Sequence, residues 1–141
     1  MISAGFDTGL HPAIILIDLR KAFDTFVHNL LHKQMIYLAF SESTIQWYKF
    51  YFSKRTFIFN INDKFSQLGN VTCGVPQGSI LGPILFLLYV NDMPQAIKSR
   101  LLLYADDSCV LYQHKHVKAI EQQLNHDFAN LCDWFVDNKL R

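Results

Sequence analysis

Three aspartates lie where a strand-like sequence usually carries apolar side chains. Asp18 ends the β-branched run of residues 13–17, and Asp106 and Asp107 stand together between two apolar segments. Adjacent carboxylates repel each other, and a divalent cation that prefers oxygen ligands, Mg²⁺ first, relieves that repulsion. Two such ions can support an in-line phosphoryl displacement. Because that chemistry needs carboxylates from separate strands, the three aspartates are candidate metal ligands.

The same aspartates also have a simpler interpretation. Most Asp-Asp pairs are polar turns, and Asp18 could cap a helix. A Tyr-x-Asp-Asp tetrapeptide such as Tyr104-Ala105-Asp106-Asp107 arises by chance in roughly one chain in a hundred of this length. The carboxylates therefore need support from other parts of the sequence.

Composition sets the scale of the molecule. The chain has 141 residues and is 50% hydrophobic, which is enough for one domain with its own core and too little for two. Its net charge is +1, whereas a self-sufficient nucleic-acid-binding domain usually has a strong basic excess. Charge alone does not indicate a nucleic-acid partner.

The number and spacing of the cysteines, together with the expected lack of a signal peptide, favour a reduced intracellular setting. Cys73, Cys109 and Cys132 form no C-x-x-C pair, and their odd number argues against a disulfide framework or a zinc site. We expect no signal peptide, because the first ten residues have no basic stretch. We also expect no membrane span, because the longest apolar stretch, residues 80–90, is interrupted and well short of about 20 residues.

Apolar periodicity predicts strands around the aspartates. Residues 13–17 are predicted to form a strand buried on both faces. Two short strands, 101–105 and 108–112, flank the Asp-Asp pair and would place it at the tip of a hairpin. A second hairpin is predicted over residues 56–72, with its turn at Asn62-Asp63.

The remaining segments have helical spacing. Residues 29–53 are predicted to be helical, and Ser43 and Gln46 could form a capping box at the start of a second helix. Pro83 suits the first turn of a helix over 84–90. Another amphipathic helix is predicted over residues 117–135, with its apolar face formed by Val117, Ile120, Leu124, Phe128, Leu131 and Phe135. Together these elements predict a mixed α+β domain.

Three motifs, in the order in which the reverse transcriptases have them, make the sequence resemble that family. It most closely resembles the reverse transcriptases of non-LTR retrotransposons of the LINE type. Residues 17–24, Ile-Asp-Leu-Arg-Lys-Ala-Phe-Asp, resemble motif A of the polymerase palm. Residues 74–83, Gly-Val-Pro-Gln-Gly-Ser-Ile-Leu-Gly-Pro, resemble motif B, and residues 103–107, Leu-Tyr-Ala-Asp-Asp, resemble motif C. The resemblance runs from about residue 13 to the C-terminus. It implies that residues 1–141 are a partial reverse transcriptase domain with a palm-like antiparallel sheet backed by helices.

The resemblance assigns roles to the acidic residues and their neighbours. It implies that Asp18, Asp106 and Asp107 bind two Mg²⁺ ions, with Mn²⁺ as an alternative, and that the backbone oxygen of Leu19 helps. Lys21 would face the triphosphate, although a charged residue after a strand is more often a solvated surface residue.

The resemblance also implies contacts to the incoming nucleotide. Phe23 would be a steric gate against a 2′-hydroxyl, where a core aromatic is the simpler interpretation. Gln77 and Gly78 would lie beside the nucleotide, with glycine allowing close backbone approach. The implied partners are an RNA template, a DNA primer and deoxynucleotides. Lys54-Arg55 could touch the template backbone, although an ordinary surface pair is the simpler interpretation.

The fingers and thumb of this family are expected outside the chain, so alone it would be an inactive or weak RNA-directed DNA polymerase. Two rival hypotheses stay open. One is the palm of an RNA-templated RNA polymerase. The other is a non-catalytic retroelement remnant that binds nucleic acid or a protein partner. Residues 25–28, Thr-Phe-Val-His, depart from the family, where a small aliphatic residue and an aspartate commonly precede the histidine.

Overall fold

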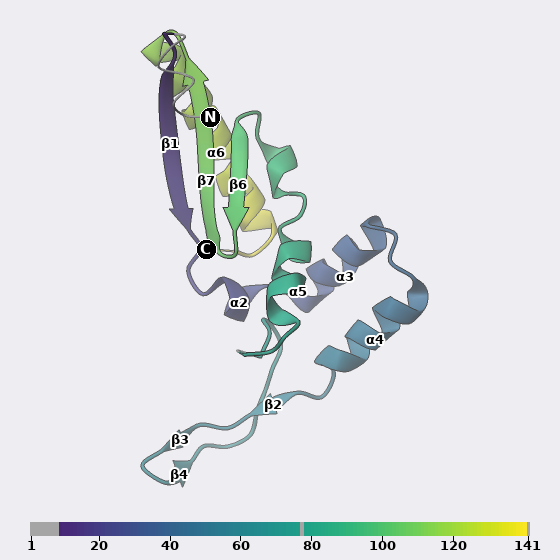
Figure 1. Ribbon diagram of the computed structural model, residues 1–141. Coiled ribbons are helices and arrows are strands. Elements are labelled where there is room, and N and C mark those ends of the chain that lie inside the picture. Colours follow the sequence, from purple (N-terminus) through teal and green to yellow (C-terminus); the bar gives the residue numbers. More distant parts are fainter. Residues whose placement is uncertain (1–8, 77, 141) are drawn as a thin grey trace. The chain divides into compact units, whose positions relative to one another are not determined.

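The computed structural model describes residues 9–76 and 78–140, and its helices and strands gather into two compact units (Figure 1). One unit combines Met1–Ala22 with Val90–Arg141, and the other is Phe23–Tyr89. Each unit has its own secondary structure, and the mixture of helices with antiparallel strands confirms the predicted α+β class. None of the described helices is long and apolar enough to cross a membrane.

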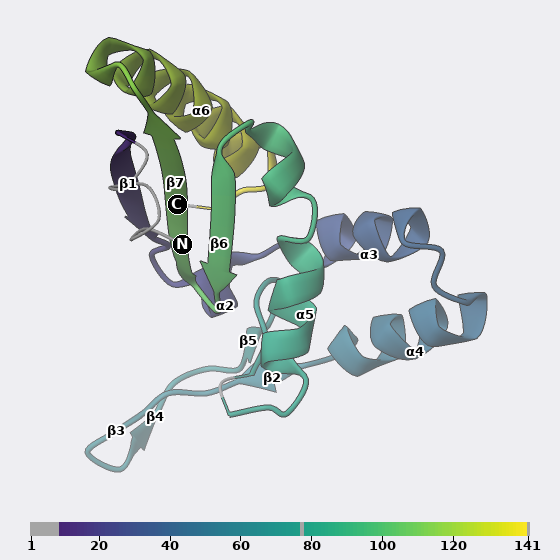
Figure 2. The same ribbon diagram turned by 45° about the horizontal axis from the view of Figure 1, so that its top comes forward.

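The first unit is built on a three-stranded antiparallel sheet. Strands β1 (His11–Asp18), β7 (Asp107–His114) and β6 (Arg100–Tyr104) lie in the order β1-β7-β6. The 3-10 helix η1 (Met93–Ala96) precedes β6, and helix α6 (Val117–Asp137) follows β7. Figure 2 shows α6 lying along one face of this sheet. The core between them includes Val110, Ile120, Leu124 and Leu131, all buried.

The prediction that residues 13–17 are buried on both faces is wrong. Side chains of β1 alternate in exposure, and Leu16 is 80% exposed. The reason is that α6 packs on one face of the sheet, so alternate side chains of an antiparallel strand point away from it. Ile14 and Leu102 are about half exposed on the same open face as Leu16. The apolar run reflects strand propensity rather than double burial.

Helices dominate the second unit. Helix α2 (Ala22–Thr25) begins at its boundary, and α3 (His28–Tyr37), α4 (Glu42–Phe52) and α5 (Gly82–Tyr89) follow. Helix α3 packs on both α4 and α5. The helical predictions are confirmed, but the cap of α4 is Ser41 rather than Ser43, because the Ser41 hydroxyl accepts the backbone N–H of Thr44 at 3.3 Å.

A narrow ribbon of short strands connects α4 to the segment before α5. Strand β2 (Thr56–Phe57) pairs with β5 (Gly69–Asn70), and β3 (Asn60–Ile61) pairs with β4 (Lys64–Phe65). The turn falls at Asn62 and Asp63, whose φ values of 49° and 61° are those of a tight hairpin. The predicted second hairpin is confirmed.

Candidate active site

Strand pairing places two of the three candidate carboxylates face to face. Asp18, the last residue of β1, is the register partner of Asp107, the first residue of β7. Directly opposed residues of an antiparallel pair have Cβ atoms about 4.5–5.5 Å apart and point to the same face of the sheet. Both side chains are exposed. Residues 89 positions apart in the sequence thus become neighbours at one end of the sheet.

The third carboxylate lies on the adjoining turn. Tyr104 is the last residue of β6 to pair with β7, and its partner is Asp107. Ala105 and Asp106 therefore form a two-residue turn, in which Ala105 has a φ of 53°. A positive φ at the first turn position suits the twist of a hairpin, although a non-glycine residue rarely adopts it. Asp106 is half-buried at this tip, next to Asp107.

An open pocket on the uncovered face of the sheet ends at the opposed carboxylates. Its volume is about 390 Å³, and its lining includes Leu16, Leu102 and Tyr104 as well as Asp18 and Asp107. Tyr104 is 82% exposed and Leu16 80%. The carboxylates thus lie in a pocket whose other lining residues are mostly apolar.

The aspartates do not form a complete metal cage. Within residues 9–76 and 78–140, no group of three or more His, Cys, Asp or Glu side chains converges closely enough to hold a metal ion. The structure brings Asp18 and Asp107 together as a pair and leaves Asp106 beside them on the turn. Leu19, whose backbone oxygen was the fourth expected ligand, has a buried side chain.

Phe23, the expected steric gate, belongs to the second unit. Its ring packs against Phe86 with ring centroids 4.9 Å apart, and the side chain is half-buried. Its backbone carbonyl accepts a hydrogen bond from the N–H of Val75 at 2.9 Å. The residue is therefore held by the segment that resembles motif B.

Gly74 makes this attachment possible. The N–H of Gly74 donates to the carbonyl of Phe26 at 2.8 Å, and the φ of Gly74 is 69°. A Cβ at this position would lie 2.6 Å from the carbonyl oxygen of Phe23, closer than real Cβ contacts. His28 adds a third link, because its Nε2 lies 2.7 Å from the carbonyl oxygen of Gly74. The start of the motif B segment thus packs backbone to backbone on the end of the motif A segment.

The other expected nucleotide-binding residues are Gly78, Gln77 and Lys21. Gly78 has a φ of 79° and open space where a Cβ would be. Gln77 lies outside the described residues. Lys21 is exposed in the first unit and has a φ of 55°.

Comparison with known proteins identifies the family. The family described as reverse transcriptase (RNA-dependent DNA polymerase) matches residues 5–141. The chain belongs to the reverse transcriptase family. It is 35% identical over 122 residues to the probable RNA-directed DNA polymerase from transposon X-element of Drosophila melanogaster, covering 81% of this chain and 13% of that protein.

Further relatives of this chain come from a second mobile element. The RNA-directed DNA polymerase from mobile element jockey is 30% identical in Drosophila melanogaster and 34% in Drosophila funebris, each over 129 residues. These matches cover 84% and 85% of this chain, but only 14% of each jockey protein. The predicted LINE-type relationship is confirmed, and the chain spans about one seventh of the length of these relatives.

Sequence reasoning missed two residues that organise the described structure. His28 is hydrogen-bonded to Gly74 and stacks on Phe52 with centroids 4.0 Å apart. Asp127 is fully buried in α6. A signal for Asp127 was present, because it lies three residues after Leu124 and four before Leu131, at core spacing. His28 has no comparable signal, since its partner is a backbone carbonyl 46 positions away.

Proposed function

We propose that this chain supplies the catalytic carboxylates of an RNA-directed DNA polymerase, with Asp18, Asp106 and Asp107 holding two Mg²⁺ ions. Mn²⁺ would substitute, and the backbone oxygen of Leu19 would be a further ligand. The observation that carries the proposal is the register that sets Asp18 opposite Asp107. Like charges directly opposed across two strands destabilise a sheet. A bound cation removes that penalty.

The donor set suits magnesium. Carboxylate oxygens are its preferred protein ligands, and Mg²⁺ commonly keeps several waters while one or two carboxylates and substrate phosphates hold it. Two exposed, opposed carboxylates with a third on the adjacent turn fit that pattern. Bound metal ions would supply the positive charge that activates a primer 3′-hydroxyl and stabilises the leaving pyrophosphate.

Other residues of the chain would position the substrates. Phe23, anchored by Phe86 and Val75, would exclude a 2′-hydroxyl and so select deoxynucleotides. Gln77 and Gly78 would lie beside the incoming nucleotide, and Lys21 would face its triphosphate. RNA template and DNA primer would be the macromolecular partners. Because the chain covers 13–14% of its relatives, we propose that efficient synthesis needs the rest of the polymerase.

The first test is a Mn²⁺ titration followed by electron paramagnetic resonance, which reports the free ion. We expect the wild-type chain to bind Mn²⁺ and Mg²⁺ to displace it. The double variant Asp106→Ala, Asp107→Ala should lose at least tenfold in affinity, because two of the three carboxylate ligands are gone. Equal binding by both proteins would contradict a site at these carboxylates and favour a non-catalytic remnant.

The chain contains a matched control for this titration. Asp63 also lies in the two-residue turn of a hairpin, between β3 and β4. Asp63→Asn removes one negative charge from a hairpin tip, as Asp106→Asn does, but it leaves all three proposed carboxylate ligands in place. Only the Asp106 variant should weaken Mn²⁺ binding.

Primer extension on an RNA template tests the reaction itself. We expect at most weak extension by the isolated chain, abolished in the double aspartate variant. Any extension should prefer deoxynucleotides, and Phe23→Ala should reduce that preference. A preference for ribonucleotides in the wild type would instead favour an RNA-templated RNA polymerase.

A further inference from the structure

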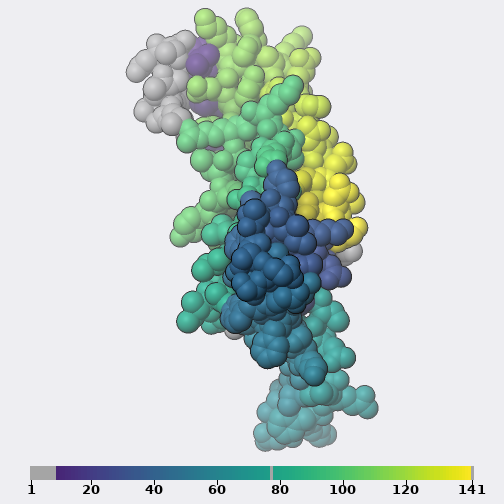
Figure 3. All heavy atoms as spheres, turned by 90° about the vertical axis from the view of Figure 1, so that its right-hand side faces the viewer, coloured from purple at the N-terminus to yellow at the C-terminus, as the bar shows by residue number. Residues whose placement is uncertain are grey.

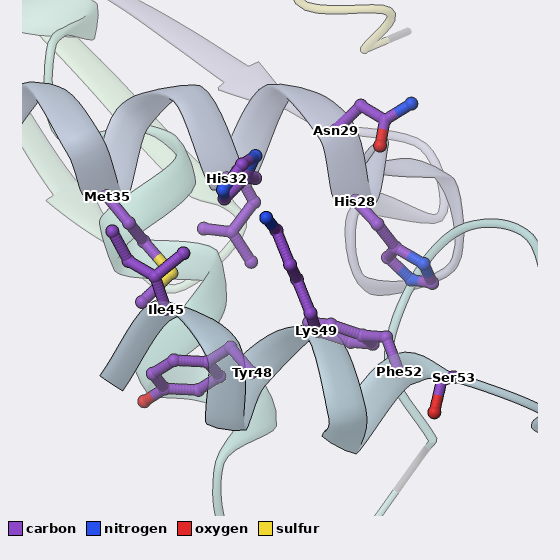
Figure 4. Close-up of a pocket in the computed structure, with 10 residues that line it drawn as sticks. His28, Asn29, His32, Met35, Ile45, Tyr48, Lys49, Phe52 and Ser53 are labelled. Atoms are coloured by element: carbon purple, nitrogen blue, oxygen red, sulfur yellow. The ribbon is translucent and has the colours of Figure 1, made fainter. Parts of the chain in front are cut away.

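A second pocket lies between α3 and α4, within the helical unit (Figure 4). Its volume is about 190 Å³. Leu31, Met35 and Ile45 form a buried apolar floor. Figure 4 shows the ammonium group of Lys49 extending from α4 into the space between the helices, towards His32 on α3. The pocket therefore combines an apolar base with a cation at its opening.

The polar groups of this pocket are suited to an anion. Its ten described lining residues include Lys49, His28 and His32 but no aspartate or glutamate. The surrounding sequence is also basic. Residues 28–55 carry a net charge of +3, whereas the whole chain carries +1. This stretch contains one carboxylate, Glu42, and four basic side chains: Lys33, Lys49, Lys54 and Arg55. Positive charge is thus concentrated on α3, α4 and the two residues Lys54 and Arg55 that follow α4, despite a nearly neutral total.

Aromatic rings continue from the pocket around α4. Trp47 stacks on Tyr51, with centroids 5.6 Å apart and planes 18° apart, and the guanidinium of Arg55 lies 4.3 Å from the centre of the Tyr51 ring. Tyr51 in turn contacts Phe52, which stacks on His28 at the pocket. We call Trp47, Tyr51 and Arg55 the α4 stack.

The outer surface of α4 presents large apolar side chains to solvent. Phe50 is 79% exposed and Trp47 51%. Helices α3 and α4 together form the blue region at the front of Figure 3. A surface that alternates exposed aromatic rings with cations is the chemistry that single-stranded nucleic acid requires, because bases stack on the rings and phosphates pair with the cations.

We propose that α3 and α4 form a binding site for single-stranded nucleic acid, separate from the aspartates. Lys49 and His32 hold one phosphodiester at the pocket between the helices. The α4 stack and Phe50 receive neighbouring bases, and Arg55 and Lys54 contact the next phosphates. The site reads no particular base, since stacking and phosphate contacts are tolerant of sequence. Here Lys54 and Arg55 become part of a nucleic-acid surface rather than an ordinary surface pair.

The test is the fluorescence anisotropy of labelled 20-nucleotide oligo(dT) and oligo(U) with the full 141-residue chain in EDTA. We expect Lys49→Gln to weaken binding several-fold and to reduce the slope of log affinity against log salt by about 0.7, the value for one lost contact with a single strand. EDTA chelates divalent metal ions, so oligonucleotide binding is measured without them. The result is therefore independent of the outcome of the Mn²⁺ titration.

Lys33→Gln is the matched control. Lys33 is an exposed lysine of α3 that does not line the pocket, so both variants lose the same charge from the same pair of helices. Only Lys49→Gln should change the salt slope. Equal losses in the two variants would overturn the pocket assignment, because they would indicate attraction by net charge alone.

Tryptophan fluorescence tests the stacking directly. The chain has two tryptophans, Trp47 and Trp134, so a Trp134→Phe background leaves Trp47 as the reporter. We expect oligo(dT) to quench it, and Trp47→Ala to weaken binding at least fivefold. Phe59→Ala, which removes an exposed ring of the ribbon, should have little effect. Unquenched Trp47 fluorescence in a complex, or displacement of the oligonucleotide by a polyglutamate peptide at similar affinity, would overturn the proposal.

Discussion

Gly74 and Gly78 bracket the motif B segment, and their surroundings differ although both have positive φ. The close approach expected of Gly78 is to an incoming nucleotide, and the structure leaves open space where its Cβ would be. Gly74 lies against another part of the chain, because an added Cβ would meet the backbone of Phe23 and Asp24 at 2.6–2.7 Å. Glycine at both positions is consistent with a positive φ, but the sequence does not say which of the two glycines lies against another segment.

These two positions give a direct comparison. Gly74→Ala should destabilise the chain by about 3 kcal/mol, since it combines a strained φ with a backbone clash, whereas Gly78→Ala should cost about 1 kcal/mol from φ alone. Urea unfolding followed by circular dichroism measures both. Equal losses in the two variants would show that the contact at Gly74 relaxes easily.

The aspartates illustrate what was predictable at single positions. Spacing and flanking apolar runs suffice to place Asp106 at a hairpin tip and Asp18 at a strand end. Their approach to each other depends on β1 pairing with β7 over eight positions, which no local pattern in either segment specifies. The motif resemblance supplied that expectation.

The opposed pair has its own thermodynamic consequence. Without metal, Asp18→Asn should raise the free energy of unfolding, by up to about 1 kcal/mol, because it removes a like charge from across the strand pair. Millimolar Mg²⁺ should raise the Tm of the wild type more than that of the variant, because a ligand stabilises the state that binds it. Thermal melts with and without Mg²⁺ measure this, and an identical Mg²⁺ response in both proteins would count against Asp18 as a ligand.

At the scale of elements, α6 shows how a correct helix can have a misplaced apolar face. The predicted helix is confirmed as Val117–Asp137. Its expected apolar stripe included Val117 and Phe128, yet these are 65% and 45% exposed, while Asp127 is completely buried. Periodicity fixes the repeat of a helix, but it treats an aspartate as a surface residue.

Asp127 is buried because it holds the chain that leads into β6. Its carboxylate accepts hydrogen bonds from the backbone N–H groups of Lys98 and Ser99 at 3.1 and 3.0 Å, and from the Gln123 amide at 3.0 Å. Burial raises the pKa of Asp127, but the hydrogen bonds from Ser99, Lys98 and Gln123 outweigh it and hold the pKa below its ordinary value of 3.8. The folded state therefore favours the ionised form.

The pH dependence follows from the sign of that shift. A carboxyl with a lowered pKa contributes stability that is present above pH 3.8 and is lost as the pH falls through the folded value. Asp127→Asn should cost about 2 kcal/mol at pH 7, because an amide N–H₂ would face a backbone N–H. The difference from the wild type should shrink below pH 3.8.

Urea unfolding at pH 7 and pH 3 measures this difference. Asp133, an exposed residue of α6, provides the control, since Asp133→Asn should have little effect at either pH. A loss for Asp127→Asn that is the same at both pH values would mean that charge is not the source of its contribution.

At the scale of the molecule, the sequence predicted one partial reverse transcriptase domain over residues 1–141. That boundary remains a prediction, while the described chain gathers into two compact units. Composition and length cannot distinguish one core from two smaller ones. The partition depends on long-range pairing, since β1 joins β6, β7 and α6 across the whole of residues 23–89.

A deletion tests whether the sheet unit folds by itself. Replacing residues 23–89 by about twelve Gly and Ser residues, which span roughly 20 Å as a flexible chain, keeps β1, β6, β7 and α6. We expect cooperative thermal unfolding of the shortened chain, because its buried residues, among them Val110, Leu124 and Leu131, come from elements that it retains. Asp127→Asn in this background should lower the Tm as it does in the full chain, which identifies the retained structure as native. A shortened chain without a cooperative transition would instead favour a single domain over residues 1–141, in which the helical unit is needed for the sheet to fold.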